Sequence, residues 1–148
     1  MSDKKMLLLL IVLFLCIFLP PIASKPFSPQ QTPLVIRDVI TQTTYLWLSP
    51  IIHVATIILL VALYLYGNKA GRVADVFFAI LFLFFALGQN IAVTGDYGLA
   101  IVTGNLVIIL VVALFWIWEV YKPQNEYTFK RLRWWRYWVI PFSVLAFW

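Results

Sequence analysis

Six polar side chains are the residues of this sequence best suited to chemistry, because they interrupt stretches that are otherwise apolar. They are His53, Gln89, Asn90, Asp96, Thr103 and Asn105. An imidazole and a carboxylate can bind a metal ion or move a proton, and amides and hydroxyls can hold a polar ligand. These residues fall near the ends of three apolar runs, two of which a tight turn joins. We therefore expect them at about the same depth in the folded chain.

This polar cluster has three interpretations. In the first, amide and hydroxyl groups bond across helices and stabilise a bundle. In the second, the groups line a pocket for a small solute, an ion or a partner's loop. In the third, His53 and Asp96 contribute two ligands to a shared metal site, which another chain must complete because stable sites use three or four. His53 as a haem ligand would need a partner's second axial ligand in the same way.

Recognisable catalytic and cofactor signatures are missing from the sequence. The chain has one cysteine, Cys16, and no P-loop, dinucleotide-binding, nucleophile-elbow or zinc-protease motif. We therefore predict no catalytic residue, no metal and no cofactor bound by this chain alone.

Four apolar runs dominate the chain and must position the polar cluster. They are Met6–Leu19, Pro50–Tyr66, Val73–Val93 and Leu99–Val120. Of the 148 residues, 64% are hydrophobic and 11% are charged, whereas soluble domains carry roughly 25% charged residues. A helix of about 20 apolar residues crosses the hydrocarbon layer. The predicted fold is all-α: a polytopic integral membrane protein with a small antiparallel transmembrane helix bundle, three of whose helices lie in 50–121.

The first run leaves two alternatives open for residues 1–24. A basic start, a short apolar stretch and small residues near Ser24 are typical of a cleaved signal peptide, and they equally suit a retained signal anchor. Residues 25–49 are polar and rich in proline, so we expect an external loop, with a short turn of interfacial helix at Leu34–Ile40.

Loop charge predicts the orientation in a cell membrane. With the N-terminus cytoplasmic, nine of the eleven basic residues lie inside, and Lys25 and Arg37 lie outside. The nine are Lys4, Lys5, Lys69, Arg72, Lys122, Lys130, Arg131, Arg133 and Arg136. The expected topology is multi-pass, with residues 25–49 outside and the segment 122–136 in the cytoplasm.

The predicted cytoplasmic segment 122–138 is both basic and aromatic. Its interfacial residues are Lys130, Arg131, Arg133, Trp134, Trp135 and Arg136. Rings at the membrane boundary and cations on phosphates fit an anchor on anionic lipid headgroups, and an acidic partner subunit is the alternative. A membrane position argues against nucleic acid. Residues 139–148 are predicted to start a further apolar helix, too short to span the layer.

Two carboxylates are expected at the inner membrane boundary. Asp75 would open the third run, where a helix N-terminus favours negative charge. Glu119 would end the fourth run and pair with Lys122 or Arg72. Neither residue lies mid-membrane in this reading, so the sequence offers no proton relay.

Small residues predict where helices approach one another. Gly88 and Ala92 are four apart in the third run, and Ala100 and Gly104 are four apart in the fourth. Such pairs let backbones touch, so we expect these two runs to meet near their shared turn.

These features favour a non-catalytic accessory subunit of a larger membrane complex for electron transfer, oxidation or transport. The chain would stabilise neighbouring subunits by helix packing, with the bilayer and other membrane subunits as its partners. The alternative is a small homo-oligomeric transporter or channel whose entry is the polar cluster. The inner halves of the runs are almost purely apolar, which disfavours a channel because a channel needs a polar track across the layer.

Overall fold

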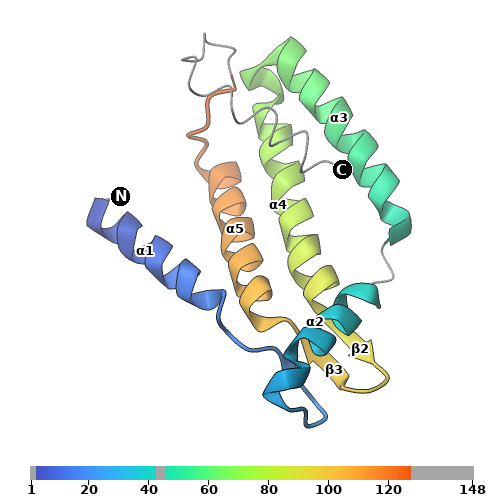
Figure 1. Cartoon of the computed structure of the whole chain (residues 1–148). Coiled ribbons are helices and arrows are strands. Elements are labelled where there is room, and N and C mark those ends of the chain that lie inside the picture. The colour runs from blue at the N-terminus through green and yellow to red at the C-terminus, as the bar shows by residue number, and fades with distance from the viewer. Residues whose placement is uncertain (1–2, 43–45, 128–148) are drawn as a thin grey trace, which may run out of the picture.

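The computed structural model describes residues 3–42 and 46–127. This part of the chain forms five α-helices and three short strands (Figure 1). In order they are α1 (Asp3–Cys16), β1 (Ile22–Ala23), α2 (Thr32–Thr41), α3 (Ser49–Tyr66), α4 (Asn68–Asn90), β2 (Ile91–Thr94), β3 (Gly98–Ile101) and α5 (Thr103–Tyr121). Single turns of 3₁₀ helix at Pro29–Gln31 and Leu46–Leu48 precede α2 and α3.

Three of the helices, α3, α4 and α5, are long and apolar enough to cross a membrane, as the predicted transmembrane helix bundle requires. Their 18, 23 and 19 residues correspond to ~27, ~35 and ~29 Å of helix, against ~30 Å of hydrocarbon. The fourth apolar helix, α1, has 14 residues and is shorter than a typical span.

The pair α4 and α5 forms the centre of the helix arrangement. Buried alanines on both helices, Ala79 and Ala86 on α4 and Ala113 on α5, let the two backbones run close together. Across this interface the rings of Phe78 and Trp116 contact each other, with their centroids 4.7 Å apart. In Figure 1, α3 lies along the other side of α4, and α1 diverges from α5.

At one end of the helices lies a small cap, formed by residues 19–42 and 91–102. It holds a three-stranded antiparallel sheet in the order β1-β3-β2. The all-α prediction is therefore wrong for this part of the chain. The error arose from the small and aliphatic residues on both sides of the Thr94–Gly98 turn, which resemble two helix ends in the sequence. In the structure these residues pair as a hairpin, to which β1 adds a third strand.

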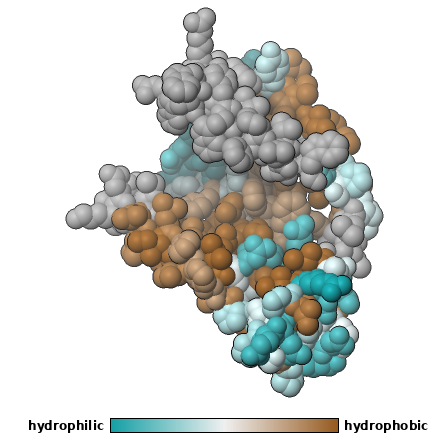
Figure 2. Space-filling model, viewed as in Figure 1, coloured by the Kyte–Doolittle hydropathy of each residue, from teal (hydrophilic) through white to brown (hydrophobic). Residues whose placement is uncertain are grey.

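Helix α2 covers one face of this sheet. Val35 and Val39, one helical turn apart, are fully buried against Tyr97 and Ala100. The predicted external loop 25–49 thus contains a ten-residue helix that closes a small hydrophobic core. Figure 2 shows hydrophilic residues gathered over the cap and hydrophobic residues over the helices.

The connection between α3 and α4 is shorter than the predicted loop Gly67–Arg72. Gly67 alone turns the chain, with a φ of +52°, and α4 begins at the next residue. The polar residues from Asn68 to Arg72 end the apolar run but not the helix. Hydropathy therefore located the end of the apolar run and missed about one and a half turns of helix.

The two runs meet near their shared turn as predicted, but as strands rather than helices, with Ala92 of β2 paired with Ala100 of β3. Ala100 belongs to β3 and packs under α2. Gly104 faces α1, because a Cβ placed there would lie 2.4 Å from the carbonyl oxygen of Cys16. The missing side chain thus lets the end of α1 pack directly on the start of α5.

Candidate functional site

Asn90 is the centre of the polar groups at the cap end of the helices. It ends α4 and its side chain is 1% exposed. Its Nδ2 donates hydrogen bonds to the carbonyl oxygens of Phe85 and Ala86, at 3.0 and 3.1 Å. Its Oδ1 accepts a 2.6 Å bond from Asn105 Nδ2 on α5. One amide thus bonds the backbone of its own helix, one turn earlier, and joins that helix to α5.

The other predicted members of the polar cluster have separate surroundings. Gln89 and Asp96 are exposed, Asp96 within the turn that joins β2 to β3. Thr103 donates to the carbonyl of Ile101, two residues before it, at 3.5 Å. Of the six residues, Asn90 and Asn105 are joined by a hydrogen bond. In the described part of the chain, the side chains of Gln89, Asp96 and Thr103 form no hydrogen bond with another member of the cluster.

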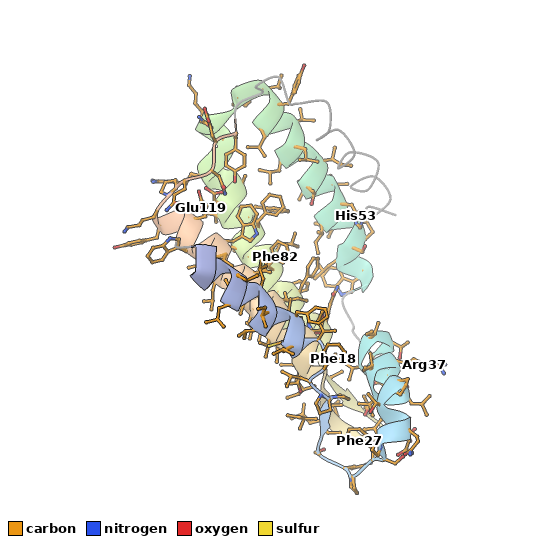
Figure 3. All side chains as sticks on the ribbon, turned by 60° about the vertical axis from the view of Figure 1, so that its left-hand side comes forward. Phe18, Phe27, Arg37, His53, Phe82 and Glu119 are labelled. Carbon is orange, nitrogen blue, oxygen red and sulfur yellow. The ribbon has the colours of Figure 1, made fainter. Side chains whose placement is uncertain are left out.

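His53 bonds within its own helix. Its Nδ1 lies 2.6 Å from the carbonyl oxygen of Ser49 and 3.3 Å from the Ser49 hydroxyl, so the ring closes the first turn of α3. Figure 3 shows His53 on α3, away from the labelled cap residues Phe27 and Arg37. Across residues 3–42 and 46–127, no three His, Cys, Asp or Glu side chains gather where they could hold a metal ion.

A second polar site lies at the opposite end of the helices, around Asp75. This carboxylate is 2% exposed and lies two turns inside α4, rather than at the helix start where the sequence placed it. The hydroxyl of Tyr127 donates a hydrogen bond to Asp75 Oδ1. The backbone N–H of Tyr127 donates to Asn68 Oδ1 at 2.6 Å. Two hydrogen bonds thus fix the chain after α5 onto the first turns of α4.

Gly71 makes room for the Tyr127 ring. A Cβ at Gly71 would lie 2.6 Å from Tyr127 Cδ2, inside any normal contact distance, so no larger residue fits without moving the ring. Asn68, Gly71 and Asp75 are spaced three and four residues apart and therefore share one face of α4. Together they form the contact site for Tyr127 on α4.

The end of α5 shapes the same segment. Glu119 accepts hydrogen bonds from the backbone N–H groups of Gln124 and Asn125. Among the described residues it does not form the predicted ion pair with Lys122 or Arg72. Lys122 instead holds its Nζ over the Trp118 ring, 5.3 Å from the centroid. Glu119 thereby folds residues 122–125 back toward α4, and Figure 3 shows it at the end of the helices opposite Phe27.

Burial and the neighbouring Asp75 raise the pKa of Tyr127 well above its ordinary value. Burial is the larger cause, since it penalises the charged phenolate, and the hydrogen bond and charge of Asp75 act in the same direction. The phenol therefore stays protonated and remains a donor at neutral pH. The sequence analysis did not predict this contact. The signal for it is the carboxylate of Asp75 near an apolar run, because a buried carboxylate is costly without a hydrogen-bond donor.

Two predictions fall outside the described residues. They are the headgroup-binding residues Lys130, Arg131, Arg133, Trp134, Trp135 and Arg136, and the apolar stretch 139–148.

The chain has no detectable match among protein-family models, curated proteins or solved structures. Its function must therefore be argued from its own residues. Both polar sites consist of hydrogen bonds between helices or between a helix and a following segment. In the described part of the chain these hydrogen bonds fix helices in place.

Proposed function

We propose that this chain is a multi-pass membrane protein that acts as a non-catalytic accessory subunit of a larger membrane complex. Electron transfer, oxidation and transport complexes are the classes we consider. In this role the chain would stabilise neighbouring subunits by helix packing.

The open helix arrangement is the observation that carries the proposal. In the most apolar 18 residues of each candidate span, only 6% of the residues of α3 and 17% of those of α5 are buried within the chain itself, against 33% for α4. Large apolar side chains such as Ile58 on α3 and Leu114 on α5 are 64% and 62% exposed. These faces are available to the helices of other subunits as well as to lipid.

The two polar sites support a structural role over transport. Asn90 bonds the backbone of its own helix and accepts from Asn105, and Asp75 accepts from Tyr127. Hydrogen bonds of this kind hold helices together within a membrane. A transporter would need such groups turned toward a solute.

The proposed orientation places the cap outside the cell and Tyr127 in the cytoplasm. Lys69, Arg72 and Lys122 occupy the end that carries Tyr127, whereas the cap carries Lys25 and Arg37. Basic residues concentrate on the cytoplasmic side of membrane proteins, and anionic headgroups there would attract them.

We further propose that residues 1–24 act as a retained signal anchor. Support comes from β1, which pairs with β3 through Ile22↔Ile101 and Ala23↔Ala100, and from Cys16, whose carbonyl lies against Gly104. Cleavage near Ser24 would remove a strand of the cap. An intact mass of the protein from its own membrane that lacks these residues would contradict this part of the proposal.

Site-specific photo-crosslinking tests the accessory role. A benzophenone side chain at Ile58 on α3, in the native membrane, should form a covalent adduct with a second, different polypeptide. The same side chain at exposed Gln30 in the cap serves as the matched control. Adducts at Ile58 with lipid alone, or with a second copy of this chain alone, would contradict the proposal.

A further inference from the structure

The sheet of the cap has two different apolar faces. Its register aligns Ala23, Ala100 and Ala92 in one row across the three strands, and this row packs under α2. Because strand residues alternate between faces, the neighbouring row of Ile22, Ile101 and Ile91 lies on the side away from α2.

Within the three strands, the side away from α2 carries only aliphatic residues. Beyond the isoleucine row, the pair Val93↔Leu99 lies on the same face. We call these five residues the aliphatic face: Ile22, Ile91, Val93, Leu99 and Ile101. It is open, since Val93 is 72%, Ile22 58% and Leu99 49% exposed. Exposed patches of contiguous aliphatic side chains on a sheet are unusual in water.

The position of the aliphatic face relative to the helices indicates its depth. β2 starts directly after the last residue of α4, β3 ends two residues before α5, and the N–H of Val102 donates to the carbonyl of Asn90 at 2.9 Å. The isoleucine row therefore adjoins the outer ends of the spans. Val93 lies two residues beyond Ile91, or ~7 Å along the strand. The headgroup layer on each side of the hydrocarbon is itself roughly 5–7 Å thick.

The composition of this face favours lipid over protein as its cover. Protein interfaces concentrate aromatic residues and arginine at their centres, and the aliphatic face has neither. Five side chains also offer far less than the ~800 Å² per partner of a stable interface. The four charged residues of the cap, Lys25, Arg37, Asp38 and Asp96, all lie outside its three strands.

We propose that the aliphatic face of the cap rests in the outer boundary of the bilayer, so that the sheet separates lipid from α2. The apolar surface of the spans then continues into the cap without a break. This inference rests on the proposed membrane position of the helices and is independent of the accessory role.

Collision measurements with nitroxide labels test this inference. With Cys16 replaced by Ala, single labels at Val93 and, in a second variant, at Leu99 are compared with labels at Ile80 on α4 and Asp96 in the hairpin turn. The full-length chain is placed in lipid nanodiscs. Oxygen collects in lipid, and a polar nickel chelate collects in water, so the ratio of their collision rates reports the surroundings.

The inference expects the labels at Val93 and Leu99 to collide more often with oxygen than with the nickel chelate, as at Ile80. A ratio equal to that at Asp96 would overturn it, because the face would be in water. Immobile labels that neither reagent reaches would also overturn it, because protein would cover the face. An aqueous ratio at Ile80 as well would show that the membrane position itself is wrong.

Discussion

The hydroxyl of Tyr127 reaches back across the end of the helices to bond Asp75, a buried carboxylate two turns inside α4 and 52 residues earlier in the chain. The bond joins the segment after α5 to α4, which packs against both α3 and α5. It provides Asp75 with a hydrogen-bond donor away from water, where an unpartnered carboxylate would be costly.

Removal of the Tyr127 hydroxyl should therefore destabilise the protein. In Tyr127→Phe the ring still packs against Gly71, and Asp75 loses its donor. We expect the free energy of unfolding to fall by about 1–3 kcal/mol, measured by thermal unfolding in mild detergent. Tyr121→Phe is the matched control, since Tyr121 is 81% exposed. Equal stability of the two variants would show that the Asp75 contact contributes nothing.

Alkaline pH should weaken the same contact. The folded pKa of Tyr127 lies above the unfolded value, which is about 10 for tyrosine. The stabilising effect of the protonated phenol is thus complete below pH ~10 and is lost as the pH rises through the folded pKa. The stability difference between wild type and Tyr127→Phe should shrink in that range. A difference that stays constant up to the point of alkaline unfolding would refute the assignment.

Asn90 should matter more to stability than its neighbour Gln89. Asn90→Ala leaves the Asn105 amide without its partner and removes two side-chain hydrogen bonds to the backbone of α4, and we expect a loss of about 1–3 kcal/mol. Gln89→Ala changes an exposed side chain and should stay within about 0.5 kcal/mol of wild type. Chemical or thermal unfolding of both variants provides the comparison. Similar losses would mean that the buried network is not the cause.

The hairpin turn requires glycine at one of its two glycine positions. Gly98 has a φ of +67°, and a Cβ there would lie 2.2 Å from Ser24 Oγ, which itself accepts from the Leu99 N–H at 3.0 Å. Gly98→Ala should destabilise the cap by about 1–2 kcal/mol through backbone strain alone. Gly95→Ala is the control, because no atom lies within 4 Å of its Cβ position. Faster backbone hydrogen exchange in β1 and β3 of Gly98→Ala would report the effect, and unchanged exchange would exclude it.

The limits of α3 could be predicted from sequence within one residue, because Pro50 and Gly67 bracket an unbroken apolar run. The sheet could not be predicted. Its strands lack the apolar–polar alternation of a half-buried strand, and both of its faces are apolar. Its third strand, β1, comes from about 70 residues earlier, inside what resembled a signal sequence.

The polar cluster shows a similar division. That Asn90 and Asn105 would meet follows from their positions at the ends of runs joined by a turn, and their hydrogen bond agrees with the first interpretation of the cluster. The Tyr127–Asp75 contact depends on how residues 122–127 fold back over α4. Glu119 and Gly71 determine that path, and no local pattern in the sequence encodes it.

The central claim is that this chain belongs to a larger complex, and native mass spectrometry tests it most directly. The protein is extracted from its own membrane in mild detergent, and the masses and identities of all associated chains are determined. The accessory role predicts a stoichiometric assembly with larger, different subunits that carry the cofactors or the transport path. A monomer, or an oligomer made only of this chain, would contradict the claim.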